Sequence, residues 1–373
     1  MNIAIITDSI EYKSGSRSQI ELAKILSKEN RITLIGNSKG SQKKLISDLN
    51  RASISSISIP NLPFWVKTYK YLSYFNKSSY DLILSSATLS LFLAAALSKI
   101  PLISIYHGSQ WNVLENKFFT WPGPKKLLFP LDILANIFIW FKSYPIFLMS
   151  NSVASISSHA KKDAQRLYFA KTKKIYWGAS PTSLLTTNAK MYKNKKEITI
   201  VSVSRITPYK GFHKLVEAVN QLDTSLNIKL IICGSHPQKN YLNYLKKIAT
   251  KRTQIILNAP DTLLKKIYAR GDIYATCDKY LFFGMPILEA ASNGLPVVAL
   301  NYAAAKEMVQ HGKTGFIAQD TKELKKYLEL LIKNKYLRTK FSKAAKKFAS
   351  EFTWENTAKE YEKIFKKILE KKA

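Results

Sequence analysis

Residues 281–300 read LFFGMPILEAASNGLPVVAL, a stretch that combines a loop, a helix and a strand. FFGMP carries the glycine and proline of a turn, ILEAASN has the composition of a short helix, and LPVVAL is apolar and β-branched. A helix followed directly by an apolar strand is typical of parallel α/β sheets. A lone carboxylate, Glu289, lies about one turn into the predicted helix.

The same rhythm extends in both directions from this stretch. Alternating strands and helices predict two doubly wound, Rossmann-like α/β domains that face one another. Ligands of such sheets bind beyond the carboxyl ends of the strands, so the loops after the strands are the places to look for a site. The predicted strands include NIAIITD, RITLIGN, YDLILSS, PLISIYH, KKIYWGA, ITIVSV, IKLIICG, TQIILNA, DIYATCD and LPVVAL.

The domain boundaries follow from composition. We expect an N-terminal domain over residues 1–187 and a C-terminal domain over 198–352, joined by a polar, Lys-rich linker that ends with residues 188–197. Residues 353–373 are predicted to form a terminal helix. Trp354, Tyr361, Phe365 and Leu369 are spaced seven, four and four residues apart, so they share the face that packs on the body.

Charge is the unusual feature of the composition. The 373 residues contain 58 Lys and Arg against 25 Asp and Glu, a formal net charge of +33. Such a field attracts polyanions: nucleic acid, anionic lipid headgroups or a phosphorylated small molecule. A solvated Lys-rich surface with no specific partner is the alternative. The 46% hydrophobic content is ample for two cores.

Several other classes of protein are disfavoured. Cys233 and Cys277 lie at predicted buried strand ends and suggest neither a disulfide framework nor a zinc site. MNIAIITDSI resembles a first strand rather than a signal peptide, and no apolar run is long enough to span a membrane. No two aspartates lie two residues apart, so no divalent-cation clamp is expected. We therefore expect a cytoplasmic protein.

Two cations follow the strand ITIVSV. Arg205 lies at the end of the strand and Lys210 precedes the next helix, with Pro208 and Gly211 in the turn between. Two cations at a helix N-terminus are a good receptor for a diphosphate. Ordinary surface charges are the alternative.

Three further residues are candidates by position. Gly15 lies in the sequence GSRS, a predicted loop before the first helix, where the backbone could approach a phosphate. His107 ends the strand LISIYH and could bond a sugar hydroxyl or pass a proton, although a structural histidine is the more common case. Glu289 could accept hydrogen bonds from ribose, or it could simply complement the helix dipole.

Taken in order, these blocks resemble the retaining glycosyltransferases of family four (glycosyl transferases group 1), which have the GT-B fold. The resemblance covers nearly the whole chain, and it implies that the terminal helix, residues 353–373, crosses back to the first domain. Its blocks are YDLIL, ISIYHG, ASISSHAKKD, VSRITPYKGFHKLVEA, LIICG, YARGDIYATCD, FFGMPILEAASNGLPVVA, KEMVQHGKTGFIA and FTWENTAKEYEKIF.

The resemblance implies a role for each matching residue. It assigns Arg205 and Lys210 to the diphosphate of a nucleotide-sugar, with charge stabilisation as the diphosphate leaves. It assigns Gly15 to the donor phosphates and His107 to the neighbourhood of the reacting sugar. Glu289 matches the second glutamate of the family's Glu-x7-Glu motif, which holds the ribose. Two further donor-binding matches follow: Gly284, whose loop presents backbone N–H groups to the donor sugar, and Glu307.

Two departures from the family pattern concern the sugar half of the site. The first glutamate of the motif should stand at position 281, which is leucine, and Phe282 replaces the usual glycine beside it. The later Gly-Gly turn reads Ala303-Ala304. Asp278 is a carboxylate three residues before Leu281, but we do not assign it the missing role.

The resemblance implies transfer of a sugar from a nucleoside diphosphate sugar to a saccharide or lipid-linked acceptor, with retention of configuration and without a metal or other cofactor. The leaving phosphate would accept the proton of the acceptor. A degenerate GT-B protein that binds a ligand or partner without transfer is the alternative. Nucleic acid is not an expected partner, because no nucleic-acid module is recognised.

Residues 118–149 form the most apolar segment, rich in Trp and Phe, broken by Pro and flanked by Lys. A half-inserted interfacial element of this kind is typical of a peripheral protein on an anionic membrane surface. We therefore expect binding at the cytoplasmic face of a membrane. A helix pair buried in the first domain is the alternative.

Overall fold

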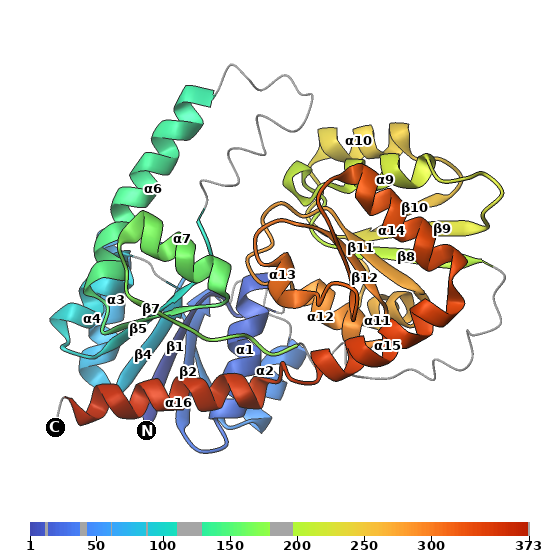
Figure 1. Ribbon diagram of the computed structural model, residues 1–373. Coiled ribbons are helices and arrows are strands. Elements are labelled where there is room, and N and C mark those ends of the chain that lie inside the picture. Colours follow the sequence, from blue (N-terminus) through green and yellow to red (C-terminus); the bar gives the residue numbers. More distant parts are fainter. Residues whose placement is uncertain are drawn as a thin grey trace. The chain divides into compact units, whose positions relative to one another are not determined.

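The computed structural model describes residues 1–11, 14–37, 43–60, 62–86, 89–109, 129–179 and 197–371 (Figure 1). The chain divides into two compact units. Unit 1 comprises Met1–Ser109, Pro130–Gly178 and Thr353–Ala373, and the core of unit 2 lies in Ala179–Phe352. Each is described by itself.

Unit 1 is built on a parallel sheet of seven strands in the order β3-β2-β1-β4-β5-β6-β7. The order reverses direction between β1 and β4, as in doubly wound nucleotide-binding domains. Apolar side chains from β1, β2 and β4 are almost completely buried, because strands covered on both faces need hydrophobic residues at successive positions. The strands are β1 (Asn2–Ser9), β2 (Arg31–Asn37), β3 (Ile54–Ser58), β4 (Leu82–Ser86), β5 (Leu102–Tyr106), β6 (Ser152–Ser155) and β7 (Thr172–Lys174).

Helices cover this sheet. Tyr71 and Phe75 of α3 share one hydrophobic core cluster with Leu91 of α4 and Ile146 of α6. The terminal helix α16 packs against α1, and its Trp354 and Phe365 are buried. The helices are α1 (Ser14–Leu26), α2 (Lys43–Arg51), α3 (Phe64–Lys77), α4 (Leu89–Leu97), α6 (Phe129–Met149), α7 (Ser158–Tyr168) and α16 (Trp354–Glu370).

Unit 2 repeats the design with a parallel sheet of six strands in the order β10-β9-β8-β11-β12-β13. The strands are β8 (Ile198–Val203), β9 (Ile228–Gly234), β10 (Thr253–Leu257), β11 (Ile273–Thr276), β12 (Val297–Leu300) and β13 (Gly315–Ala318). Its helices are the 3-10 turn η3 (Pro208–Lys210), α9 (Phe212–Asn220), α10 (Lys239–Ile248), α11 (Asp261–Arg270), α12 (Met285–Ser292), α13 (Ala305–Met308), α14 (Thr321–Lys333) and α15 (Lys335–Ala349).

The predicted fold class, two Rossmann-like doubly wound domains, is confirmed by the two parallel sheets. Some local predictions were wrong. GSRS, residues 15–18, is not a loop, because α1 begins at Ser14. The strand expected at KKIYWGA is limited to Thr172–Lys174. No element was predicted between β2 and β4, where α2, β3 and α3 lie.

The apolar segment 118–149 is described only from residue 129 onward. Within that part, α6 is one helix that contains Pro145, rather than a pair of helices. Its C-terminal end carries the buried Ile146 and Phe147, while its earlier turns are largely exposed. In Figure 1 this earlier part of α6, in green, extends beyond the sheet of unit 1. No helix in the described part of the chain is long and apolar enough to cross a membrane.

Candidate active site

The loop after β8 places Lys210 beside the end of β11. Gly211 adopts a φ of 68°, which a residue with a side chain rarely adopts. A Cβ at Gly211 would lie 2.4 Å from the carbonyl oxygen of Cys277, so the two backbones touch. This contact requires glycine and brings the residue before it, Lys210, to the carboxyl edge of the neighbouring strand.

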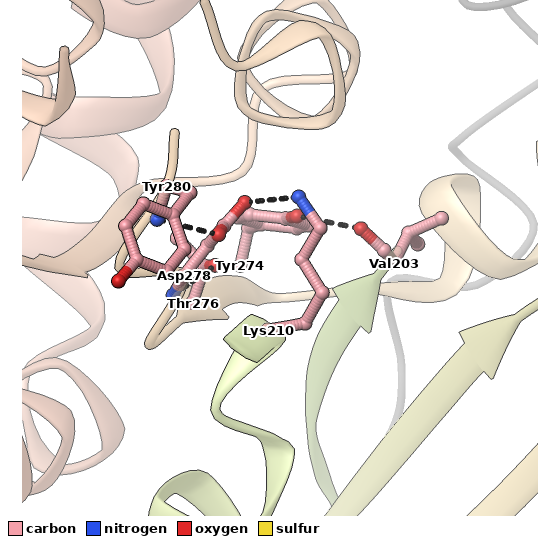
Figure 2. Close-up of polar contacts among 6 residues, drawn as sticks. All are labelled: Val203, Lys210, Tyr274, Thr276, Asp278 and Tyr280. Carbon is pink, nitrogen blue, oxygen red and sulfur yellow. Dashed lines mark hydrogen bonds and ion pairs between the residues drawn. The ribbon is translucent and has the colours of Figure 1, made fainter. Parts of the chain in front are cut away.

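Lys210 forms an ion pair there with Asp278. Its Nζ lies 2.5 Å from Asp278 Oδ2, and the two side chains are 13% and 4% exposed (Figure 2). The other carboxylate oxygen, Oδ1, accepts the backbone N–H of Tyr280 at 3.0 Å. The backbone N–H of Asp278 donates to Thr276 Oγ1 at 3.3 Å. The carboxylate is thus held in place by the turn that follows β11.

Arg205 lies nearby on the same loop and is exposed. Its guanidinium carbon lies 5.7 Å from the centre of the Tyr209 ring, and Lys210 Nζ lies 5.3 Å from the same centre. Both cations therefore lie near one aromatic ring at the carboxyl end of β8.

A buried tyrosine donates a hydrogen bond to Glu289. The N-cap of α12 is Gly284, with a φ of 100°, and the helix carries Glu289 in its second turn, where the residue is 9% exposed. Tyr268 on α11 donates its hydroxyl hydrogen to Glu289 Oε2 at 2.9 Å. Burial, followed by the negative charge of Glu289, raises the pKa of Tyr268 well above its ordinary value, so the phenol remains a donor.

The structure therefore brings Arg205, Lys210 and Glu289 to one edge of the unit 2 sheet. β8 and β11 are neighbours, and the strand order reverses between them, which makes this the position where doubly wound sheets bind ligands. Glu307 lies in the short helix α13 after β12, on the adjoining part of this edge.

At position 281, where the family pattern places a glutamate, the leucine is buried. Leu281 is 6% exposed, and its carbonyl accepts the N–H of Ala304 at 2.9 Å. Both of its methyl carbons would lie 3.3 Å from a Cβ at Gly284. Ala303 has a φ of 49°, the left-handed conformation that favours glycine. The backbone thus keeps the conformation of a glycine turn although the sequence has alanine.

The candidate residues of unit 1 form a separate group. His107 follows β5, and its Nε2 lies 2.8 Å from Ser86 Oγ. Gln19 of α1 donates to the same hydroxyl at 2.9 Å and to the carbonyl of Ile6 at 3.2 Å. Because Ser86 accepts from Gln19, its own hydrogen is available to His107 Nε2. Gly15 lies in the first turn of α1, the helix that carries Gln19.

Burial lowers the pKa of His107 to about 4, so its imidazole is neutral at physiological pH. Its ring also packs edge-on against Trp177, with 4.8 Å between the ring centres. A neutral, oriented imidazole can exchange hydrogen bonds with a hydroxyl but carries no cationic charge.

Sequence reasoning missed three supports of these residues: Tyr268, Ser86 and Gln19. No spacing in the sequence indicates them, because each meets its partner only through the sheet order. Asp278 was noticed only as a neighbour of position 281, and its ion pair with Lys210 was not foreseen. Among the residues that the structure describes, no group of three His, Cys, Asp or Glu side chains could hold a metal ion.

The sequence is similar to that of known glycosyltransferases. Residues 186–348 match the family model for glycosyl transferases group 1. An uncharacterised glycosyltransferase of Methanocaldococcus jannaschii is 26% identical over 343 residues, which cover 83% of this chain and 82% of that protein. The N-acetyl-alpha-D-glucosaminyl L-malate synthase of Bacillus anthracis is 24% identical over 56% of this chain and 55% of its own length.

Two solved structures show the same fold along nearly the whole chain. A glycosyltransferase from Rickettsia africae superposes with a TM-score of 0.78 at 19% identity, covering 99% of this chain and 98% of that one. HepE of Anabaena, solved in complex with UDP-glucose, gives a TM-score of 0.77 at 19% identity, covering 98% and 100%.

The two sheets and these superpositions define a protein of the GT-B class. The matched region and the relatives show that the chain is similar to glycosyltransferases of group 1.

Proposed function

We propose that this glycosyltransferase transfers a sugar from a nucleoside diphosphate sugar with retention of configuration. The observation that carries the proposal is that Arg205 and Lys210 follow β8 and Glu289 follows β11, the two strands that adjoin where the strand order reverses. Two cations suit a diphosphate, and a carboxylate in the adjoining helix suits ribose hydroxyls. The UDP-glucose bound by HepE supports a donor of this class.

The residues divide the chemistry as follows. Arg205 and Lys210 offset the negative charge that grows on the diphosphate as the glycosidic bond breaks. Backbone N–H groups at Gly284 orient the donor, with Glu307 beside them, and Gly15 is proposed to approach the phosphates from the first turn of α1. The leaving phosphate takes the proton of the acceptor, so no protein nucleophile is required. Because the cations already supply positive charge, we propose that no metal takes part.

His107 is proposed to bind a hydroxyl of the reacting sugar. Its neutral state suits this role, since a neutral imidazole can donate one hydrogen bond and accept another. Ser86 and Gln19 fix the orientation of the ring from behind.

We also propose that the acceptor is a lipid-linked saccharide, reached at the cytoplasmic face of an anionic membrane. α6 exposes an apolar stripe at helical spacing: Leu131 is 63% exposed, Leu134 60%, Phe138 59% and Phe141 64%. Such a stripe in water is costly unless something covers it. The net charge of +33 favours an anionic lipid surface.

α3 supplies a second exposed element on the same unit. Trp65 is 74% exposed and Tyr69 69%, one turn apart. Lys67 and Lys70 are their neighbours in the sequence of α3. Aromatic rings with neighbouring cations are typical of residues at a membrane interface. Ile146 of α6 and Tyr71 of α3 share a core cluster, so both helices belong to one layer of the unit.

The donor is tested by thermal shift with a panel of nucleoside diphosphate sugars. Stabilisation by one of them, lost in Arg205→Ala and Lys210→Ala but kept in Lys322→Ala, is the expected result. Lys322 is an exposed lysine on α14, so it controls for general loss of charge. No response to any donor would refute the proposed function.

The membrane contact is tested by sedimentation with vesicles of phosphatidylglycerol and phosphatidylcholine at low salt. The double variant Phe138→Ser/Phe141→Ser should release the protein, whereas Tyr336→Ser, at a 77% exposed aromatic on α15, should not. Equal binding by both variants would leave α6 without this role. Failure of the wild type to sediment would remove the membrane from the proposal.

A donor-binding protein without transfer is the second candidate, and the buried Leu281 favours it. The carboxylate that the family pattern places at this position is absent, so the transferred sugar loses one contact. Donor stabilisation without release of nucleoside diphosphate, in the presence of lipid-linked acceptors, would support this second function. Turnover would exclude it.

A further inference from the structure

We propose that Asp278 is a positioning residue for donor binding, which holds the ammonium group of Lys210 in place for the diphosphate. The inference rests on the proposed function, because it assigns Lys210 to the donor phosphates. It adds a residue to which neither the family pattern nor the sequence assigned this role.

The first argument is that contacts other than Lys210 hold the carboxylate of Asp278 in place. Asp278 follows β11, and Oδ1 accepts the N–H of Tyr280 at 3.0 Å. Its side chain is 4% exposed, so it has little freedom to turn towards solvent. Figure 2 shows the carboxylate between Tyr280 and the end of the Lys210 side chain. It is a rigid acceptor on a strand end.

The second argument concerns Lys210. A lysine carries its charge at the end of a flexible stem and loses much rotamer freedom when it is fixed. The ion pair at 2.5 Å fixes it in advance, on a side chain that is only 13% exposed. An ammonium has three N–H donors, and Asp278 Oδ2 takes one. The remaining donors can serve a phosphate while the ion pair stays intact.

The third argument excludes another role for Asp278. Both of its carboxylate oxygens are already engaged, one by Lys210 and one by Tyr280. Because the carboxylate is also only 4% exposed, we do not assign it the sugar contact of the glutamate missing at position 281. It acts through Lys210, and its effect should appear in the binding of the diphosphate rather than in the choice of sugar.

The first experiment needs no ligand. Wild-type protein and Asp278→Asn are treated with an amine-reactive N-hydroxysuccinimide ester, and acetylation of Lys210 is followed by mass spectrometry with Lys214 as the internal reference. In the wild type Lys210 should react about tenfold more slowly than in Asp278→Asn. Equal reactivity would show that the ion pair does not hold Lys210 in solution and would overturn the proposal.

The second experiment measures binding of UDP, GDP and ADP by calorimetry. For the nucleotide that binds, Asp278→Asn should weaken affinity by about tenfold or more, and Asp278→Glu should restore part of it. The double variant Lys210→Met/Asp278→Asn should bind the nucleotide no more weakly than Lys210→Met alone, because Asp278 acts through Lys210. The loss of nucleotide affinity caused by Glu289→Gln should instead add to the loss caused by Asp278→Asn.

The outcomes separate the two claims. If the wild type binds a nucleotide and Asp278→Asn binds it equally well or more tightly, the carboxylate is only structural or competes with the phosphate. The inference about Asp278 then fails, while the proposed function stands. If the wild type binds none of these nucleotides and responds to no donor of the thermal-shift panel, the proposed function fails and the role of Asp278 in donor binding falls with it. Thermal unfolding of every variant identifies any that does not fold.

Discussion

Two buried tyrosines in unit 2 offer a matched test of how Glu289 is stabilised. Tyr268 donates to the carboxylate of Glu289 at 2.9 Å, and Tyr274 donates to the backbone carbonyl of Val203 at 3.2 Å. Both tyrosines are almost completely buried, at 2% exposure. Tyr268→Phe and Tyr274→Phe remove the same hydroxyl group from similar surroundings, and the acceptors differ in charge.

The expected magnitudes follow from that difference. A hydrogen bond to a charged group contributes about 1.5–3 kcal/mol, and one between neutral groups about 0.5–1.5 kcal/mol. Tyr268→Phe should therefore lower the free energy of unfolding by roughly 1 kcal/mol more than Tyr274→Phe. In a unit of this size that difference corresponds to roughly 2–4 °C in the melting temperature.

The measurement is urea unfolding followed by circular dichroism, with the two variants side by side. If Tyr274→Phe cost as much as Tyr268→Phe, the carboxylate would not be the acceptor that makes this bond strong. The reasoning about Glu289 would then be wrong. Nucleotide affinity should fall in Tyr268→Phe and stay unchanged in Tyr274→Phe, since only the former acts on Glu289.

Three further outcomes are expected. The pKa of His107 is lowered to about 4 in the folded protein, so the unfolded chain takes up the proton first as the pH falls. The contribution of His107 to the free energy of unfolding is therefore fully present above about pH 6.5 and falls by roughly 1–3 kcal/mol towards pH 4. The difference between the free energies of unfolding at pH 4.5 and pH 7.5 should be smaller for His107→Gln than for the wild type. Ala303→Gly should raise the free energy of unfolding by about 0.5 kcal/mol, because glycine adopts a φ of 49° without strain. Ala304 has a negative φ, so Ala304→Gly should lower the free energy of unfolding in the same urea unfolding experiment. Leu281→Glu should destabilise by about 2–4 kcal/mol because it places a carboxylate at a site 6% exposed; an unchanged melting temperature would contradict the apolar environment seen at this position.

The sequence predicted the sheets well because parallel strands covered on both faces must be apolar. ITIVSV and IKLIICG appear as β8 and β9 nearly residue for residue. Short or polar strands gave no such signal, and ISSIS, which forms the edge strand β3, was missed. The start of α1 was misplaced because serines and glycine are also common in loops.

The candidate site was predictable only in part. Arg205, Lys210 and Glu289 stand at strand ends or helix starts, positions that the order of elements already reveals. Their partners are set by strand order, which joins residues distant in sequence: Lys210 and Asp278 are 68 positions apart, and Tyr268 and Glu289 are 21 positions apart on two different helices. Such pairs have no local pattern.

The membership of α16 in unit 1 has a consequence for how the protein is made. Thr357 Oγ1 donates to the carbonyl of Tyr176, 181 residues earlier, and Trp354 lies against Gly178. Because a ribosome delivers the chain from its N-terminus, unit 1 begins synthesis first but receives its last helix after all of unit 2 has emerged. Unit 2 is therefore complete first, and the nascent unit 1 must wait with the surface that α16 will cover still exposed to the chaperones of the cell.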